Sequence, residues 1–386
     1  MIWSRMYDIV VVGGGPVGAT AARLSAEAGL STLLIEEHAA AGHPVQCAGL
    51  LSSSAFAECE VTDRSVQNTI QGARIVSEKG SELLFDAEKT KAYVVDRAAL
   101  DREMLQAAAA AGADILMKTY AEWKKPGFIT TRGASGQKEI PHRICIAADG
   151  PRSGIARSAG LPRPRYLLAG IQADIVLDRD PRFVELHPDA SPDFFGWVIP
   201  ISDTRARVGL CGLTDIPARF SAFIKNYAPT SVHCVTGAIP LGPPEQTYSD
   251  RLMVCGDAAG LPKPTSGGGI YTGIRSARHA VATAVRAFEV DNTRAEALYT
   301  YQRLWKADIG RELALGLKLF EMRGKLNSDD IDSAIQALSD PEILKIIVED
   351  GDMDRPGKLV RRLLFRPELL PLFGRLGLMQ LLRGIT

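Results

Sequence analysis

Residues 7–18, Tyr-Asp-Ile-Val-Val-Val-Gly-Gly-Gly-Pro-Val-Gly, decide the fold of this chain of 386 residues. The apolar, β-branched run at 7–12 predicts a buried strand, and the glycines after it predict a sharp turn. An alanine-rich segment from Ala19 to Ala28 predicts a helix that ends at Gly29. Ser31–Glu36 then predicts a second buried strand that ends in an acid. This order of strand, glycine turn, helix and strand indicates a parallel βαβ unit.

The glycine spacing in this setting is typical of a site for the pyrophosphate of a dinucleotide. Gly13 permits the sharp turn, Gly15 lets the backbone approach the phosphates, and Gly18 permits close packing of helix on strand. Pro16 lies in the same turn, before the helix whose positive end meets the phosphates. Glu36 is placed to accept hydrogen bonds from the adenosine ribose, which disfavours a 2′-phosphate there.

A region near residue 260 favours FAD over NAD as the dinucleotide. Asp257 follows a strand predicted at 251–255 and could bind the ribityl hydroxyls of a flavin. The next glycines begin a long helix predicted at 270–288, whose amide groups can face the flavin pyrimidine ring and stabilise negative charge there. The residues expected to face the ring are Gly267, Gly268, Gly269 and Ile270.

Two further positions are predicted to complete the cofactor site. Asp149 and Gly150 follow a buried strand predicted at 143–148 and could lie behind the dinucleotide. Arg97 begins a helix predicted at 97–111 and could reach the cofactor phosphates. Asp96 before it is a good helix N-cap, so a purely structural role for this segment stays open.

The glycine turn, the region around Asp257, the Asp149–Gly150 pair and the Arg97 helix start together resemble the glutathione-reductase-like flavoproteins. Among these, the resemblance is to the branch with the aromatic hydroxylases, and within it to the geranylgeranyl reductase family. The resemblance extends from Tyr7 to about Ala284. Residues 44–49, Pro-Val-Gln-Cys-Ala-Gly, look like the family's cysteine-bearing loop, which lies near the flavin. Residues 192–200 are similar to its Pro-x-x-Tyr-x-Trp-x-Phe-Pro signature, with Phe195 in place of the tyrosine and Ile199 in place of the phenylalanine.

The elements and the resemblance predict an α/β fold, α+β overall. A Rossmann-like FAD-binding domain is expected with an interleaved antiparallel-sheet substrate domain and a C-terminal helical region. The expected bounds are 1–60, 96–165 and 245–290 for the FAD-binding domain, 61–95 and 166–244 for the substrate domain, and 291–386 for the helical region.

The resemblance implies a FAD-dependent reductase that saturates the isoprenoid C=C bonds of geranylgeranyl chains, on archaeal-type membrane lipid precursors. Cys47, Phe195 and Trp197 are then the catalytic candidates. The cysteine would position or protonate the alkene, and the two aromatics would hold it over the flavin. Cys47, Ala48 and Gly49 are also expected to contact the cofactor. A small buried thiol and ordinary core aromatics remain the structural alternatives.

Two other functions fit the same cofactor architecture. A flavin-dependent monooxygenase of the aromatic-hydroxylase type would activate oxygen, and residues 195–200 are also similar to the Trp-x-Trp-x-Ile-Pro element of flavin-dependent halogenases. A non-catalytic prenyl-lipid-binding flavoprotein would bind the lipid without reoxidising its flavin. Substrate-stimulated oxygen consumption would distinguish the first of these from a reductase.

Composition and charge restrict the partners. The 45 Lys and Arg balance the 45 Asp and Glu, which argues against nucleic-acid binding. The 6 cysteines are too few for a disulfide scaffold and lack zinc-site spacing, so we expect no metal. With no apolar run long enough to span a membrane and no signal-peptide pattern at the first residues, we expect a cytoplasmic protein. The electron donor, NADPH or a ferredoxin-like protein, stays open.

The end of the chain adds a membrane hypothesis. Residues 355–386 contain Lys and Arg at 355, 358, 361, 362, 366, 375 and 383, with one acid, interleaved with leucine and phenylalanine. A basic amphipathic surface would attract anionic headgroups, so peripheral contact with the inner face of the membrane is expected. Helices that only cap the substrate domain are the alternative.

Overall fold

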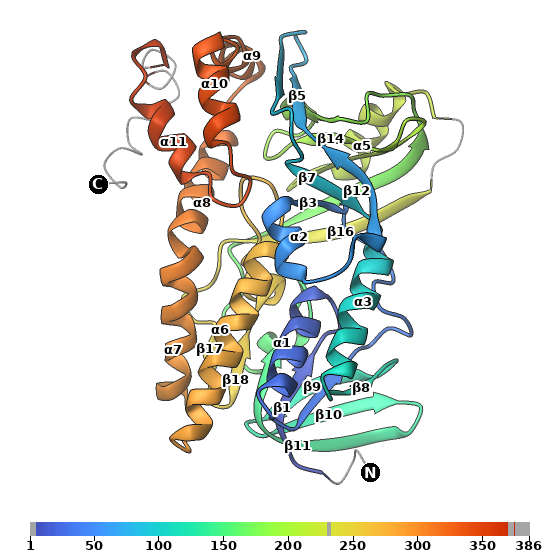
Figure 1. The fold of residues 1–386 in the computed structure, drawn as a ribbon, viewed down its shortest axis with the longest axis vertical. Helices are drawn as coiled ribbons and strands as arrows, with labels where there is room; N and C mark the ends of the chain where they lie inside the picture. The colour runs from blue at the N-terminus through green and yellow to red at the C-terminus, as the bar shows by residue number, and fades with distance from the viewer. Residues whose placement is uncertain (1–4, 230–232, 370–373, 375–386) are drawn as a thin grey trace.

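A parallel sheet forms the first layer of the computed structural model, which describes residues 5–229, 233–369 and 374 (Figure 1). Its strand order is β8, β2, β1, β11, β18, and all neighbours in this series are parallel. The central strand β1 has five of its six residues buried, as expected for a strand covered on both faces. The strands are β1 (Tyr7–Val12), β2 (Thr32–Ile35), β8 (Asp114–Leu116), β11 (Gly136–Ala147) and β18 (Leu252–Val254), with β17 (Tyr248–Ser249) antiparallel to β18.

Three helices pack side by side against this sheet and enclose the largest apolar core. They are α1 (Pro16–Glu27), α3 (Arg97–Ala110) and α6 (Ile270–Glu289), with α1 between the other two (Figure 1). The sequence predicted the first helix from Ala19, but it begins at Pro16. Proline suits this first helical position because its fixed φ is helical and its missing N–H would have had no partner there.

The strand β11 is shared by two sheet regions. Its second half pairs with β1, and its first half pairs antiparallel with β10 (Phe128–Gly133), which in turn pairs with β9 (Tyr120–Lys125). The sequence predicted only the last part of β11, because residues 120–140 carry many charged and threonine side chains and no apolar run. The short helix α4 (Gly154–Ser158) packs on β9.

A seven-stranded sheet forms the second layer, in the order β16, β12, β15, β14, β13, β5, β6. Its neighbours are antiparallel except β13 and β5, which are parallel. Its strands are β5 (Gly72–Val76), β6 (Glu82–Asp86), β12 (Tyr166–Val176), β13 (Phe183–His187), β14 (Gly196–Ser202), β15 (Arg205–Gly212) and β16 (Cys234–Leu241). A helix that the sequence reading missed, α5 (Ile216–Lys225), covers one face with its apolar side.

Smaller elements connect the two layers. A three-stranded sheet of β3 (Leu50–Ser52), β7 (Ala92–Val95) and β4 (Val66–Ile70) packs on β14, and α2 (Ser53–Cys59) packs on α6. Short 3-10 turns lie at η2 (Asp63–Ser65), η3 (Pro188–Ala190), η4 (Gly256–Ala259) and η6 (Pro367–Leu369).

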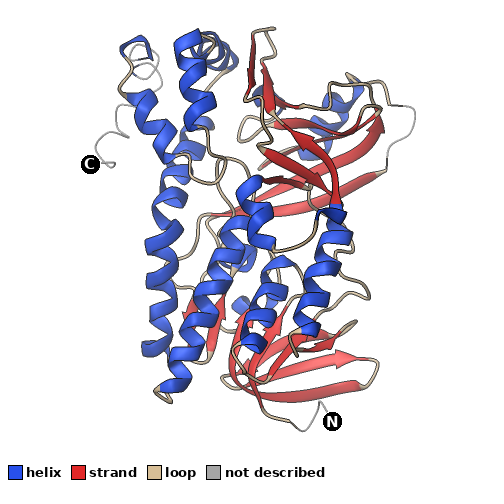
Figure 2. Ribbon diagram, viewed as in Figure 1, coloured by secondary structure: helices blue, strands red, loops and turns tan. Residues whose placement is uncertain are grey.

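The chain after α6 is helical, as predicted, in the part that the structure describes (Figure 2). One run lies along α6, and a second group stands beside β6. The helices are α7 (Ala295–Trp305), a π-helical turn (Lys306–Gly310), α8 (Arg311–Arg323), α9 (Ser328–Leu338), α10 (Pro341–Asp350) and α11 (Gly357–Leu364). Within the described ranges, no helix is both long enough and apolar enough to cross a membrane.

Alanine substitutions at two glycines test the packing of the turn between β1 and α1. A Cβ on Gly18 would lie 1.8 Å from the carbonyl oxygen of Gly13, whereas a Cβ on Gly15 would meet no atom within 4 Å. Gly18→Ala is therefore expected to lower the free energy of unfolding of the FAD-free protein by about 1–3 kcal/mol. Gly15→Ala should lower it by less than about 1 kcal/mol. Urea unfolding measures both variants, and equal losses would contradict this account.

Candidate active site

The glycine turn after β1 leaves an open surface beside a buried acid. Gly13 has a φ of +102°, and a Cβ there would lie 2.2 Å from the carbonyl oxygen of Ala148. Glu36 is 8% exposed, and its Oε2 accepts a hydrogen bond of 2.5 Å from the backbone N–H of Gly14. The open space over Gly15 lies at the start of α1, where helix amides attract phosphate. The turn therefore has the shape that a pyrophosphate requires.

The second carboxylate oxygen of Glu36 is held by a residue that the sequence reading did not single out. Its Oε1 accepts a hydrogen bond of 2.8 Å from the backbone N–H of His38 and lies 2.6 Å from the ring Nδ1 of the same residue. Both oxygens of Glu36 are thus fixed at the edge of the turn.

Asp149 has a structural function in the chain. Its carboxylate accepts hydrogen bonds from the Ser153 hydroxyl at 2.6 Å and the Ile155 N–H at 3.0 Å, at the beginning of α4. Burial raises the pKa of Asp149, and these hydrogen bonds oppose the rise. Gly150 has a φ of +80° and no atom within 4 Å of a built Cβ, so the backbone there borders open space.

A loop of glycines lies over Asp257 at the start of α6. A Cβ on Gly269, the residue before that helix, would lie 2.5 Å from Oδ1 of Asp257. This carboxylate makes no hydrogen bond to another described residue. Burial raises the pKa of Asp257 to about 6, while the charge of Arg97 lowers it. A half-buried carboxylate without a partner has oxygens available to accept hydrogen bonds from the hydroxyl groups of a bound cofactor.

The same loop contacts the second layer. Gly267 has a φ of +72°, and a Cβ there would lie 3.0 Å from Cδ1 of Ile239 and 3.6 Å from Cζ of Phe194. Gly268 packs on the side chain of Lys263, and Ile270 is the first residue of α6. The predicted flavin-facing loop therefore borders the aromatic segment at 192–200.

Arg97 is bound by protein groups. Its Nε and one terminal nitrogen each lie 3.0 Å from an oxygen of Asp101, and its side chain is 12% exposed. Burial lowers the pKa of Arg97, but the carboxylate of Asp101 and the sulfur of Cys47 raise it above its ordinary value. Arg97 thus interacts with both the cysteine loop and, electrostatically, Asp257.

The cysteine loop is fastened to the seven-stranded sheet. The half-buried Cys47 accepts a hydrogen bond of 3.4 Å at Sγ from the N–H of Gly49. The carbonyl oxygen of Ala48 accepts one of 2.7 Å from Arg207 in β15. Arg207 also forms a bidentate pair with Asp174 of β12, at 2.7 and 2.9 Å. This pair was not predicted from the sequence, where the only indication was the presence of charged residues in β12 and β15, which are otherwise mainly apolar.

The segment before β14 forms an aromatic wall. Phe194 and Phe195 are stacked with ring centroids 4.4 Å apart, and Phe195 meets the edge of Trp197 at 6.2 Å. Phe194 is buried and also contacts Phe320 of α8, whereas Phe195 and Trp197 are half-buried. Within the described residues, the indole N–H of Trp197 has no hydrogen-bond partner. Phe195 and Trp197 therefore keep part of their aromatic surface exposed.

Ile199 differs from the other members of the signature. It is 3% exposed and packs with Ile70, Ala73 and Val184 in a core between β14 and the three-stranded sheet. Ile199 therefore lies within the signature segment, but its side chain belongs to the core.

Replacement of Asp257 by asparagine tests this half-buried acid through pH. The pKa of about 6 lies above the ordinary 3.8, so the folded FAD-free protein binds this proton more tightly than the unfolded chain. The Asp257 carboxyl therefore lowers the free energy of unfolding. The loss grows as the pH rises from 3.8 and reaches its full size above about 6. Asp257→Asn should raise the free energy of unfolding by about 1–3 kcal/mol at pH 8, with little change near pH 3.8.

The same variant should bind FAD about tenfold more weakly, because hydrogen bonds to a charged acceptor are lost. Urea unfolding at the two pH values and FAD titration of the apoprotein measure the two effects. An Asp257→Asn protein no more stable than the wild type at pH 8 would contradict this account of the acid.

Comparison with known proteins confirms the predicted cofactor. The family model described as FAD binding domain matches residues 6–217, more than half of the chain. Digeranylgeranylglycerophospholipid reductase 2 of Methanothermobacter thermautotrophicus is 32% identical over 361 residues, which cover 88% of this chain and 94% of the relative. The digeranylgeranylglycerophospholipid reductase of Methanospirillum hungatei is 30% identical, and the match covers 98% of this chain and 99% of the relative.

Solved structures agree with this fold. A geranylgeranyl bacteriochlorophyll reductase-like protein of Thermoplasma acidophilum is 26% identical and superposes with a TM-score of 0.82, covering 93% of this chain and 98% of that one. The p-nitrophenol 4-monooxygenase of Pseudomonas putida is 17% identical with a TM-score of 0.70, covering 89% and 97%, and shares the fold alone.

FAD is therefore the cofactor that the glycine turn and the unpartnered Asp257 fit. The alternatives of a monooxygenase and a non-catalytic carrier are not favoured. Relatives at this identity, aligned over nearly their whole length, share more than a fold with this chain, which is a FAD-dependent oxidoreductase of the digeranylgeranylglycerophospholipid reductase family.

Proposed function

We propose that this protein saturates the C=C bonds of geranylgeranyl chains, on archaeal-type membrane lipid precursors, with electrons from FAD. The observation that carries the proposal is the contact between the predicted flavin-facing loop, residues 267–270, and an apolar wall. In this contact Gly267 lies against Phe194 and Ile239. An apolar surface at that place suits a hydrocarbon better than a polar ring. The names of the aligned relatives, digeranylgeranylglycerophospholipid reductases, support the same substrate class.

Saturation of an isolated double bond requires one hydride, which reduced FAD supplies when bound, and one proton. The π electrons and the proton form one C–H bond, and the hydride pair forms the other. In the proposed mechanism, Phe195 and Trp197 hold the isoprenoid chain, and the negative faces of their rings stabilise positive charge that develops on the tertiary carbon. Their apolar surface also keeps water away from the reacting atoms.

Cys47 is the proposed proton donor. Its sulfur lies in a half-buried loop beside the guanidinium of Arg97. A thiol that gives its proton to carbon leaves a thiolate, and the adjacent positive charge would stabilise that thiolate until water reprotonates it. Arg207 would keep the sulfur in place through its hydrogen bond to the Ala48 carbonyl.

The remaining predicted site residues are proposed to contact FAD, and the domain division given from the sequence is proposed with them. The cofactor contacts are Gly13, Gly15, Pro16, Gly18, Glu36, Cys47, Ala48, Gly49, Arg97, Asp149, Gly150, Asp257, Gly267, Gly268, Gly269 and Ile270. For Gly18 and Asp149 the contact would be through the backbone, since Gly18 packs on Gly13 and the Asp149 carboxylate caps α4.

Peripheral membrane contact and the electron donor, NADPH or a ferredoxin-like protein, belong to the proposal as well. Lys358 and Arg362 pair with Asp350, and Arg355 pairs with Asp308, so much of the basic charge is neutralised internally. Residues 370–373 and 375–386 of the basic segment lie outside the described residues. Membrane contact would therefore rest on apolar and remaining basic groups, and co-sedimentation with anionic vesicles measures it.

An anaerobic single-turnover experiment tests the function. The enzyme-bound FAD is reduced with dithionite, excess reductant is removed, and a digeranylgeranylglycerol phospholipid is added. The flavin should reoxidise without oxygen, and the product mass should rise by two hydrogen atoms for each double bond reduced. The fully saturated lipid serves as control and should leave the flavin reduced. Reoxidation that requires oxygen would instead indicate a monooxygenase, and the proposal would be wrong.

Replacement of Cys47 tests the proton donor. Cys47→Ala should lower the rate of anaerobic flavin reoxidation by the lipid about 100-fold, in the range of a lost general acid. FAD affinity should change much less, because only the thiol is removed. The matched control is Cys234→Ala, since this exposed cysteine lies in β16 and should be silent. Unchanged turnover in Cys47→Ala would remove the thiol from the mechanism.

A further inference from the structure

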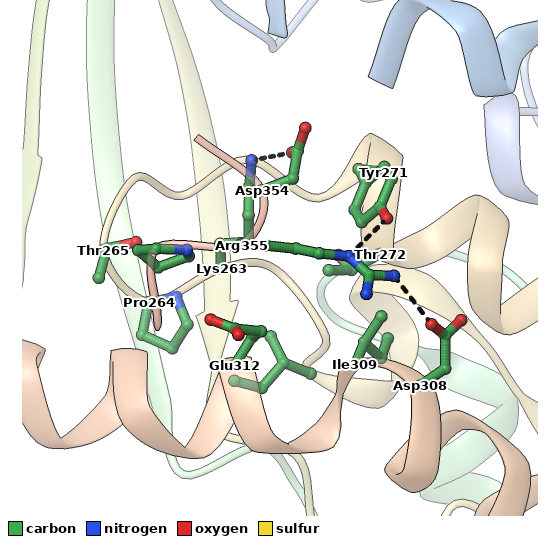
Figure 3. A pocket seen from close by; sticks show the side chains of 12 residues that line it. Lys263, Pro264, Thr265, Tyr271, Thr272, Asp308, Ile309, Glu312, Asp354 and Arg355 are labelled. Atoms are coloured by element: carbon green, nitrogen blue, oxygen red, sulfur yellow. Dashed lines mark hydrogen bonds and ion pairs between the residues drawn. The ribbon is translucent and has the colours of Figure 1, made fainter. Parts of the chain in front are cut away.

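A buried ion pair lies next to the loop proposed to face the flavin (Figure 3). Lys263 is 7% exposed and Asp354 is 3% exposed. The Nζ atom of Lys263 lies 2.5 Å from Oδ1 of Asp354 and donates a hydrogen bond of 3.0 Å to the carbonyl oxygen of Met353. The other oxygen of Asp354 accepts a hydrogen bond from the hydroxyl of Ser52, the N-cap of α2. Three segments far apart in the sequence therefore meet at one pair of charges.

Lys263 is part of the hydrogen-bonded frame of the glycine loop. Its N–H donates to the carbonyl oxygen of Gly268 at 3.1 Å, and its carbonyl oxygen accepts from the N–H of Gly267 at 2.8 Å. A Cβ on Gly268 would lie 3.3 Å from Nζ of Lys263. The ammonium group is thus directly beside the backbone of the loop.

Asp354 is supplied by the C-terminal helical region. The segment between α10 and α11 is fastened by residues that follow Asp354, and Figure 3 shows Arg355 reaching across the pocket to Tyr271 and Asp308. Arg355 donates to the Tyr271 hydroxyl at 3.2 Å and to Asp308 at 3.1 Å. The N–H of Gly357 donates to Glu312 at 2.9 Å. These contacts fix the carboxylate of Asp354 at the end of the Lys263 side chain.

We propose that the Lys263–Asp354 pair tunes the midpoint potential of bound FAD. Reduced FAD gains electron density at N1 and the C2 carbonyl, and a positive charge near these atoms favours the reduced form. Lys263 alone would place such a charge behind the loop, and Asp354 cancels part of it. In a site that excludes water, the difference between a single charge and a neutral pair is large. The inference rests on the proposed placement of the flavin pyrimidine ring against residues 267–270.

A fastening role alone would not require these charges. A well-packed apolar pair of similar volume commonly holds two segments at least as well as a buried ion pair, because burial removes both ions from water. The pair instead lets the C-terminal region control the charge beside the flavin loop. Lys263 and Asp354, about 90 positions apart in the sequence, would thus together set the net charge beside residues 267–270.

Spectroelectrochemical titration of the holoenzyme without lipid tests the inference. Asp354→Asn keeps the size of the side chain and an oxygen for the Ser52 hydroxyl, but leaves the ammonium uncompensated, so the midpoint potential should shift to more positive values. Lys263→Met keeps an apolar stem and removes the positive charge, so the potential should shift to more negative values. Shifts of opposite sign identify an electrostatic effect, because mere loosening of the loop would move both variants in the same direction.

Three further variants make the result decisive. The double variant Lys263→Met/Asp354→Asn restores a neutral pair and should return the potential close to that of the wild type. Ser52→Ala removes a hydrogen bond without a charge and should shift it little. Asp329→Asn breaks the ion pair of Lys79 and Asp329, which is exposed, and should have no effect. An unchanged or more negative potential in Asp354→Asn would overturn the inference.

The placement of the flavin has its own check. A methyl group at Gly269 would crowd Asp257, so Gly269→Ala should abolish FAD binding if the cofactor contacts this loop. Wild-type FAD affinity in Gly269→Ala would remove the basis for the inference. Since no lipid is present in these titrations, the potentials test the ion pair independently of the proposed lipid reduction.

Discussion

The close approach of backbone to backbone after β1 is the constraint on which the rest of the structure depends. At Gly13 and Gly18, a single added carbon would overlap a carbonyl oxygen, and no rearrangement of side chains could make room for it. This contact lets α1 begin close after a strand with five of its six residues buried, and the first N–H groups of α1 then lie beside the open space over Gly15. In the proposed site, the position of the phosphates would then fix where the flavin can lie, and therefore which part of the second layer it can face.

The parts of the fold that the sequence predicted well carry their signal locally. The glycine turn, the long helix after Gly269, and the strands β1 and β2 each combine an apolar run with a turn residue at a defined position. The β9–β10 hairpin was missed because its side chains face water on one side and resemble those of a loop. The pairing of β13 with β5 could not be read from either strand, since it joins segments about 110 residues apart.

The same distinction applies to the site. Asp257 and the cysteine loop could be found because each follows a recognisable motif, whereas Arg207, Asp174 and Asp354 gain a role only from partners in other segments. Ile199 shows that a residue inside a signature need not face the ligand. It packs into a core that holds the signature strand in place. The C-terminal region likewise has a role besides any contact with lipid, since Arg355 binds Tyr271 and Asp354 binds Lys263, on either side of residues 267–270 in the sequence.

The central claim is that FAD lies between the glycine loop and the aromatic wall, with the cysteine loop at the reacting edge. A crystal structure of the holoenzyme with a bound prenyl lipid tests it most directly. The account predicts that the flavin ring packs on residues 267–270, that the lipid chain runs along Phe195 and Trp197, and that the sulfur of Cys47 lies within contact distance of a double bond. A flavin ring separated from this wall by protein, or a lipid bound elsewhere, would contradict it.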